Sequence, residues 1–307
     1  MIISGLTIIR DGIQLEYPFI ESIRSVLPLC DEFIVVAGKS EDGTLAAVQA
    51  IGDPKISILQ TTWSEKTTPK KCVLAQQTNI GLHLCRGDWV VYLQANEVLH
   101  EQALPALRDI MEKHVNDKRV EALLLERLSF WGDYNHVLRV YPHRFKFSPR
   151  IVRPYIGTYS IRDAMSFAVF DGFSMRGRYP RAVDTGQDIF RYGTVGAPAQ
   201  QLKKETIAVH KVEYVSPQIR DDYFYTAVPK PFVARFNRTH PAVMADRIKA
   251  FQYGLDWEDP RWRLKPSAKE YQRIFETWFY EKFGVPRIRS NRYLLIGEYG
   301  KKDRIIS

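Results

Sequence analysis

The stretch that decides the fold is residues 87–101, which read GDWVVYLQANEVLHE. Within it, Trp89–Leu93 is a short apolar run of mostly β-branched and aromatic residues, which predicts a buried strand. Three polar side chains, those of Gln94, Asn96 and Glu97, follow that strand directly. A helix is expected next, with Asn96 as its N-cap and Glu97 near its positive end. A buried strand that ends in polar residues before a helix is typical of an α/β protein that binds its ligand at the edge of the sheet.

The residues before this stretch repeat the alternation of strand and helix. The other expected strands are Ile2–Ile9, Phe33–Ala37 and Ile56–Gln60. The expected helices between them are Leu15–Leu27, Leu45–Ile51 and Cys72–Cys85. Such a series predicts an α/β fold with a mostly parallel sheet that is flanked by helices on both faces. In sheets of this kind ligands bind at the carboxyl ends of the strands, so the residues just after each strand are the candidates for a site.

The later part of the chain has a different pattern. Ala122–Phe130 predicts a further strand, and no helix period follows it, so antiparallel strands and loops are expected to complete the sheet. Helical patterns return in Gln200–Val209, Pro241–Phe251 and Ala268–Phe283. The expected organisation is one α/β domain over residues 1–197 and a C-terminal, mainly helical subdomain over residues 198–307.

The composition excludes several classes of protein. With 45% hydrophobic and 26% charged residues, the 307-residue chain is neither disordered nor fibrous. No apolar run approaches the length of a spanning helix and the N-terminus does not resemble a secretory signal, so the expected location is the cytoplasm, with the inner membrane face as a peripheral site. Cys30, Cys72 and Cys85 form no C-x-x-C pair and are expected to be buried thiols.

The net charge of +9 lies entirely in the later part of the chain. Residues 1–120 have a balance of −3, and the remaining residues have a balance of +12. A basic balance suits nucleic acid, an anionic membrane surface or a phosphorylated substrate. The basic and aromatic segment Trp131–Tyr159 contains no recognisable nucleic-acid-binding motif, so we rank that partner last and expect no nucleic acid.

Two polar loops follow the first two expected strands. The first is Arg10-Asp11-Gly12, and the second is Gly38–Thr44. The second loop offers Lys39, Ser40 and Asp42 to a hydroxyl or an anion, although Asp42 could instead only cap a helix. No G-x-G-x-x-G or P-loop motif occurs, so a bound phosphate must be held by other means.

Three motifs, in order, resemble glycosyltransferase family 2. Val35–Thr44 (VVAGKSEDGT) is similar to that family's Val-Asp-Asp-Gly-Ser-x-Asp-Gly-Thr loop. Thr78–Leu82 (TNIGL) and Arg86–Trp89 (RGDW) look like its asparagine-bearing helix and the opening of its fourth strand. Gln94–Glu97 (QANE) then falls on its Asp-x-Asp motif. The resemblance implies a GT-A fold, a nucleoside-diphosphate sugar as donor, and usually an inverting transfer that is assisted by a divalent cation, Mn or Mg.

Shorter segments beyond residue 115 are similar to a bacterial subgroup of the family. They are Arg162–Ala164, Ile189–Gly193 and Thr239–Met244. The resemblance there is weaker than in the first 115 residues.

The chain departs from the family at the positions that bind the nucleotide and the metal. Ala37 and Gly38 stand where the family has two carboxylates that help to hold the nucleobase and ribose. The Asp-x-Asp motif has become Gln94-x-Asn96, and amides are weak ligands for a hard cation. We therefore expect no metal site and a diphosphate that is neutralised by protein cations, for which the candidates are Arg191, Lys39 and the basic run Arg139–Arg153. Glu97, His100 and Glu101 would share a helix face that could bind a metal, but a solvated face is the plainer interpretation.

These arguments give a set of candidate site residues. Those expected to bind the nucleotide sugar are Arg10, Lys39, Ser40, Asp42, Gln94, Asn96, Glu97 and Arg191. An inverting transfer needs a general base within hydrogen-bond reach of the acceptor hydroxyl, and the resemblance places a carboxylate of this kind at Asp163. Asp133, Asp184 and Asp188 are its competitors.

The expected function is transfer of a sugar from a nucleoside-diphosphate donor to a saccharide or lipid-linked acceptor in glycan biosynthesis, with inversion and without a metal. The alternative is a catalytically degenerate protein that keeps the GT-A fold for binding or as a scaffold. The four missing carboxylates are the reason to retain that alternative.

Overall fold

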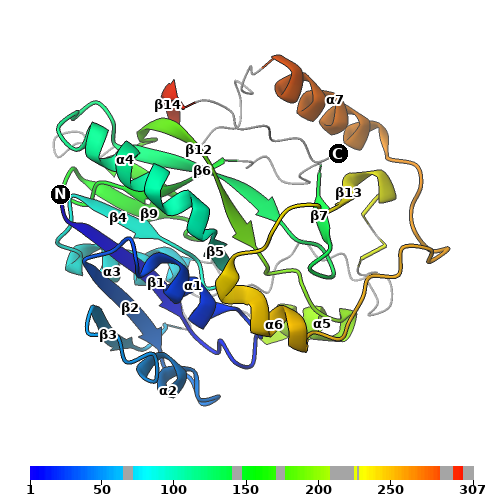
Figure 1. The fold of residues 1–307 in the computed structure, drawn as a ribbon, viewed down its shortest axis with the longest axis horizontal. Coiled ribbons are helices and arrows are strands. Elements are labelled where there is room, and N and C mark those ends of the chain that lie inside the picture. The colour runs from blue at the N-terminus through cyan, green and yellow to red at the C-terminus, as the bar shows by residue number, and fades with distance from the viewer. Residues whose placement is uncertain are drawn as a thin grey trace.

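A mostly parallel β-sheet runs through the middle of the protein (Figure 1). The computed structural model describes residues 1–64, 72–139, 147–170, 177–207, 225–226, 228–283 and 293–299. The main sheet contains nine strands of these residues, in the order β14-β12-β6-β8-β4-β1-β2-β3, with β5 paired to β12. Their bounds are β1 Ile3–Ile9, β2 Glu32–Gly38, β3 Ile56–Thr61, β4 Trp89–Tyr92, β5 Glu97–Leu99, β6 Ala122–Ser129, β8 Phe147–Val152, β12 Arg181–Arg191 and β14 Leu294–Glu298.

The direction of the strands divides this sheet into two parallel parts. Strand β1 pairs in parallel with β2 and β4, and β2 pairs in parallel with β3. Strand β12 is parallel to β6 and β14. Between the two parts lies β8, which is antiparallel to both β4 and β6. The α/β class with a mostly parallel, helix-flanked sheet, as expected of a GT-A type fold, is therefore confirmed.

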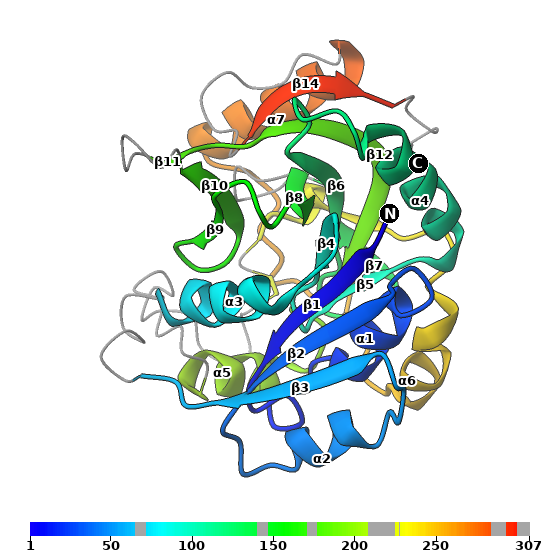
Figure 2. The ribbon, with the colours of Figure 1, turned by 90° about the vertical axis from the view of Figure 1, so that its left-hand side faces the viewer.

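Helices cover both faces of the sheet (Figure 2). On one face lie α1 and α4, and on the other lie α3 and the small sheet of β9, β10 and β11. The helices are α1 Phe19–Val26, α2 Thr44–Gln49, α3 Cys72–Leu84, α4 Leu104–His114, α5 Pro198–Ile207, α6 Ala245–Ala250 and α7 Ala268–Phe283, with 3₁₀ turns at Glu101–Ala103, Lys230–Phe232 and Ala242–Met244. The small strands are β7 His136–Leu138, β9 Thr158–Ile161, β10 Ser166–Phe170, β11 Gly177–Arg178 and β13 Val233–Arg235.

The residues after 197 contribute strands to two of the three sheets. Besides α5, α6 and α7 they supply β14, which extends the main sheet beyond β12, and β13, which pairs with β7. No helix in the described part of the chain is long and apolar enough to cross a membrane.

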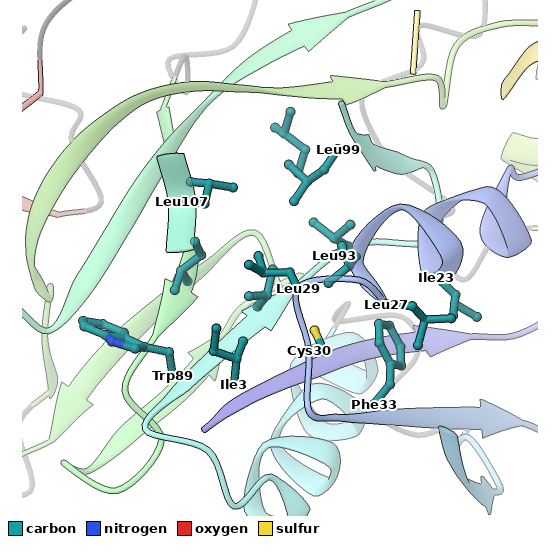
Figure 3. Close-up of a cluster of buried hydrophobic side chains, with 14 of the residues drawn as sticks. Ile3, Ile23, Leu27, Leu29, Cys30, Phe33, Trp89, Leu93, Leu99 and Leu107 are labelled. Atoms are coloured by element: carbon teal, nitrogen blue, oxygen red, sulfur yellow. The ribbon is translucent and has the colours of Figure 1, made fainter. Parts of the chain in front are cut away.

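The larger core lies between the sheet and helices α1 and α4 (Figure 3). Ile23 of α1 and Leu107 of α4 pack toward Ile3, Phe33 and Trp89 of the sheet, and all five side chains are buried. Burying side chains of this size contributes about 1.5–3 kcal/mol each. The apolar side chains of α1 and α4 that face the sheet are therefore what attaches these helices to it.

Three local expectations differ from the structure. The first helix begins at Phe19 and not at Leu15, because Pro18 is its N-cap and Glu16 has a left-handed backbone (φ 52°) that a helix cannot accommodate. Glu97–Leu99 is a strand and not the start of a helix, because it pairs with the end of β12. Cys30 and Cys85 are buried, whereas Cys72, at the start of α3, is exposed.

A glycine in α3 allows that helix to lie close to the sheet. A Cβ atom at Gly81 would overlap the side chain of Leu6 in β1 and approach Val36 of β2. We expect Gly81→Val to lower the free energy of unfolding by about 1–3 kcal/mol, because the added side chain overfills a packed interface. Urea denaturation measures this change.

The control for that variant is Gly254→Val. No atom lies within 4 Å of the position that a Cβ would take at Gly254. This change should stay within about 0.5 kcal/mol of the native value. Equal losses in the two variants would contradict the close approach of α3.

Candidate functional site

The loops after β1 and β2 are bound to each other at the carboxyl edge of the sheet. The backbone N–H of Asp11 donates to Ser40 Oγ at 2.9 Å, and that of Gln14 donates to Asp42 Oδ2 at 2.8 Å. Asp42 also accepts from the hydroxyl of Thr44 at 2.6 Å. Burial alone would raise the pKa of Asp42, but these hydrogen bonds outweigh it and the pKa lies below its usual value. Ser40 and Asp42 thus fix the shape of the β1–α1 loop. The contact of Asp42 with Thr44, the first residue of α2, agrees with the alternative that Asp42 serves to cap a helix.

Arg10 and an indole that the sequence analysis missed lie at the end of β1. The Arg10 guanidinium lies 5.6 Å from the ring centroid of Trp63 and forms an ion pair with Asp11 at 3.1 Å. The indole of Trp63 lies directly against Gly38, where a Cβ would overlap it. Its buried Nε1–H has no hydrogen-bond partner among the described residues. The one sequence feature that could have indicated this contact is Gly38, which differs from the family motif. A glycine at this position leaves space for a ring beside the strand. Lys39, which follows Gly38 in the chain, has an exposed side chain.

Glu97 is fully buried in an ion pair with Arg150. The guanidinium binds both carboxylate oxygens, with Nε–Oε2 and Nη2–Oε1 distances of 2.8 Å, and neither side chain is exposed. Burial would raise the pKa of Glu97, but Arg150 holds it below its usual value, so the carboxylate stays ionised. The same carboxylate accepts from the backbone N–H of Gln94 at 3.0 Å. Glu97 therefore acts on the site through the position of the Gln94 loop.

Two arginines of the basic run Arg139–Arg153, Arg150 and Arg153, make their contacts inside the protein. Residues 140–146 of it lie outside the described residues. Arg150 is occupied by Glu97, and Arg153 donates to the backbone carbonyls of Val120 and His114. These two side chains stabilise the fold beneath the site and supply no charge at the strand ends.

Asn96 and Arg191 lie side by side. The N–H of Tyr192 donates to the carbonyl of Asn96 at 2.8 Å. A Cβ at Gly193 would come within 2.5 Å of Asn96 Nδ2 and 3.4 Å of Arg191 Nη2, so both side chains lie against this glycine. The buried Asn96 Oδ1 has no hydrogen-bond partner among the described side chains and backbone. An amide acceptor beside a guanidinium suits a ligand that carries both hydroxyl and phosphate groups.

Two further residues lie near Arg191 and were missed by the sequence analysis. Burial raises the pKa of Tyr17 and lowers that of Lys204, and in each case the positive charge of Arg191 nearby acts to lower the pKa. Burial lowers the pKa of the Lys204 amine to about 8, and this amine donates to the carbonyl of Val195 at 3.2 Å. Nothing in the spacing of the sequence connects Lys204 with the strand ends, since helix α5 brings it there.

Asp163 lies in the tight turn between β9 and β10. Its neighbours Arg162 and Ala164 both have a left-handed backbone, with φ values of 58° and 55°. Such conformations are costly for residues with a side chain and concentrate at functional sites. Asn79 of α3 holds this hairpin by pairing with both the N–H and the carbonyl of Ser160, at 2.7 and 3.0 Å. Gln94 Nε2 approaches the carbonyl of Ala164 at 3.5 Å, which joins the Asp163 turn to the Gln94 loop.

The competing carboxylates have structural partners. Asp133 accepts from the N–H groups of Asn135 and Leu255 and pairs with His136 at 2.8 Å. Asp188 forms an ion pair with Arg238 at 2.7 Å, and Asp184 accepts from Gly186 N–H at 3.0 Å. Asp163 remains our prediction for the base, because its turn lies beside Gln94.

The residues present do not fit a divalent cation. Gln94 and Asn96 supply neutral amides, and the carboxylate of Glu97, which follows them in the chain, is already paired with Arg150. Within the described residues there is no group of three or more His, Cys, Asp or Glu side chains that could hold a metal ion.

The segment Thr239–Met244 is fixed around His240. Its Nδ1 lies 2.8 Å from the hydroxyl of Tyr192, and its Nε2 lies 2.9 Å from the carbonyl of Tyr134. Burial lowers the pKa of His240 below its usual value, because it penalises the charged ring. A neutral histidine therefore positions Tyr192, next to Arg191.

Breaking the Glu97–Arg150 pair should be costly. We expect Glu97→Gln to lower the free energy of unfolding by about 3–5 kcal/mol, because Arg150 would remain buried without a counter-charge. Replacing both residues together, Glu97→Leu with Arg150→Met, should cost much less. Denaturation by guanidinium chloride measures the free energy of unfolding of the single and the double variant. The control is Glu270→Gln, in a pair with Arg263 at the surface, and it should lower the free energy of unfolding by about 1 kcal/mol or less.

The stability of the protein should depend on pH through His240. An unfolded histidine has a pKa of about 6.5, so just below that pH the unfolded chain binds more protons than the folded protein. The free energy of unfolding should then fall as the pH drops from about 7.5 to about 5.5, and it should fall less in His240→Gln. Melting temperatures over that range measure the difference, and parallel curves for the two proteins would refute the assignment.

Known proteins resemble this chain only distantly. No family model matches the chain, and no curated protein matches its sequence. The structure is similar to crystal structures of S. aureus TarS, with a TM-score of 0.41, 14% identity and coverage of 73% of this chain and 41% of TarS. A structure of residues 1–349 of TarS has a TM-score of 0.36 with 18% identity over 51% of this chain and 48% of that one, and its complex with UDP-GlcNAc has a TM-score of 0.39 with 16% identity over 53% and 49%. The matched part of this chain therefore spans slightly less than half of the length of the TarS 1–349 structures.

Proposed function

We propose that the protein is a glycosyltransferase of the inverting kind. It would move a sugar from a nucleoside-diphosphate donor to a saccharide or lipid-linked acceptor in glycan biosynthesis, in the cytoplasm. The observation that carries the proposal is the meeting of Asn96 and Arg191 at the carboxyl edge of the sheet, with Arg10 at the end of β1 and the Asp163 turn against Gln94. This edge is where open α/β sheets bind their ligands.

In this proposal the diphosphate lies beside Arg191. A guanidinium matches the geometry of phosphate oxygens and keeps its charge at any physiological pH. Arg10 and the amide of Asn96 provide further donors and an acceptor for the ribose and phosphate groups. No step in the proposal runs through a metal, because the donor set at the former Asp-x-Asp position does not fit one.

The chemical step follows from an inverting geometry. Asp163 would take the proton of the acceptor hydroxyl, and the hydroxyl oxygen would attack the anomeric carbon from the side opposite the diphosphate. The bond between that carbon and the diphosphate oxygen breaks, and the nucleoside diphosphate leaves with the electron pair. Arg191 stabilises the negative charge that develops on the leaving group.

We also propose that residues 1–197 carry the donor side of the site and that residues 198–307 complete it. Helix α5 contributes Lys204, which lies near Arg191, and the segment before α6 contributes His240, which holds Tyr192. Both contributions come from chain that follows the donor domain.

The test is binding and turnover of a nucleotide-sugar panel with and without EDTA. UDP and UDP-GlcNAc, which occur in the TarS crystal structures, are the first probes, followed by GDP and its sugars. We expect binding and transfer to survive EDTA. Arg191→Gln should weaken binding of the nucleoside diphosphate by about tenfold or more, the scale of a charged hydrogen bond.

Two variants make this test specific. Arg263→Gln removes a surface arginine of a remote ion pair and should bind nucleotide as the native protein does. Asp163→Asn should retain donor binding while transfer falls by about 10²–10⁴-fold, the contribution of a general base. A native protein that binds no nucleotide at all would refute the proposed function, and nucleotide binding without transfer would favour the degenerate scaffold.

A further inference from the structure

A cleft of about 350 Å³ opens next to the proposed diphosphate site, between the start of α1 and helix α6. Helices α1 and α6 lie side by side in both ribbon views (Figures 1 and 2). The cleft is lined by two carboxylates, one guanidinium and three aromatic rings, which belong to Glu16, Glu21, Arg247, Tyr134, Tyr192 and Phe251. Small-molecule sites have volumes of roughly 300–1,000 Å³, so this cleft has room for a small ligand such as a sugar residue.

The aromatic walls are held in fixed orientations. Tyr192 stacks on Phe130 with ring centroids 4.6 Å apart, and its hydroxyl is bound to His240 at 2.8 Å. Tyr134 meets Phe251 edge to face at 4.9 Å and Tyr192 at 5.4 Å. Rings that are fixed before a ligand arrives lose little conformational entropy when it binds. Tyr134 and Tyr192 are almost fully buried, at 6% and 2% exposure, and Phe251 is half-buried, so Phe251 is the ring that can meet the C–H face of a sugar.

The polar groups of the cleft are also placed by the fold. Arg247 forms an ion pair with Glu21 at 2.8 Å, and both side chains remain partly exposed to the cleft. Glu16 accepts from Gln200 Nε2 at 2.8 Å and has the left-handed backbone that turns its loop toward α5. Carboxylates accept hydrogen bonds from hydroxyl groups, and a guanidinium donates to their oxygens.

The charge of the lining selects among sugars. Two carboxylates and one guanidinium give the cleft walls a formal charge of −1. A sugar that carries a carboxylate or a phosphate would be repelled by this balance, whereas a neutral sugar would not. The cleft is therefore distinct in chemistry from the neighbouring site, where Arg191 favours an anion.

The position of the cleft connects it to the transfer reaction. Tyr192, which forms one wall, directly follows Arg191 in the chain and binds the carbonyl of Asn96 through its N–H. One wall of the cleft therefore belongs to the same end of β12 as the residue proposed to hold the diphosphate. We propose that the cleft binds a neutral sugar residue of the acceptor glycan, an inference that rests on the proposed function.

The test is saturation-transfer NMR on the full chain, with methyl α-glucoside as the neutral probe and glucuronate as the anionic one. We expect transfer from aromatic protons to the glucoside and little to glucuronate. Phe251→Leu keeps the apolar volume but removes a ring face, and it should raise the apparent Kd for the glucoside by about fivefold. Phe275→Leu, on the exposed face of α7, is the matched control and should leave binding unchanged.

Titration of UDP into the same samples separates this inference from the proposed function. If UDP binds and Phe251→Leu leaves glucoside binding unchanged, the cleft inference is wrong while the donor site stands. Equal binding of glucuronate would likewise overturn it. If no nucleotide binds but the glucoside does so in a Phe251-dependent way, the cleft is a sugar site and the proposed transfer reaction is wrong.

Discussion

The arrangement of the whole site depends on one buried ion pair, that of Glu97 with Arg150. The two charges come from β5 and β8, which belong to different parts of the main sheet, and neither has access to water. A buried charge without its partner is costly, so the two strands must keep their positions relative to each other. The loop between β4 and β5 is held at the same time, because Glu97 also accepts from the N–H of Gln94.

This use of Glu97 changes the electrostatics of the strand ends. An unpaired carboxylate at Glu97 would partly cancel the charge of any cation near Gln94 and Asn96. Here the charge of Glu97 is already compensated by Arg150 within the core. The edge carries the amides of Gln94 and Asn96, the guanidinium group of Arg191, and Arg10 in its ion pair with Asp11. In the proposed function, Arg191 is the cation that attracts the diphosphate to this edge.

The sequence alone was sufficient to predict those strands and helices whose apolar pattern lies within the element itself. The strands of the first 92 residues and the helices α3 and α7 were predicted within a few residues, because the strands are short apolar runs and the helices have a helical pattern within their own sequence. The strand at Glu97–Leu99 could not be predicted in this way. Its structure is set by pairing with Ile189–Arg191, about ninety residues later, and no local pattern reports such a contact.

The same limit applies to the site. Arg10, Ser40 and Asn96 could be placed near the strand ends from the sequence, because each follows a strand that the pattern identified, and Arg191 because it lies in a recognised segment; their binding roles stay predictions. Trp63 could not be placed, because its contact with Gly38 depends on how far β3 extends past β2. The pairing of Arg150 with Glu97 was equally hidden, since Arg150 stands in the run Arg139–Arg153, whose cations were expected to neutralise the diphosphate.

The C-terminal part of the chain completes this edge. His100 lies 3.0 Å from Thr239 Oγ1, and the carboxylate of Glu101 accepts from Ala242 N–H at 3.0 Å, so the segment before α6 is attached just past β5. Through that attachment His240 reaches Tyr192, and Arg247 reaches Glu21 at the start of α1. Any shift of β5 would therefore be transmitted to the cleft as well as to Asn96. The ion pair that fixes β5 thus keeps the proposed donor and sugar sites in a constant relation to each other.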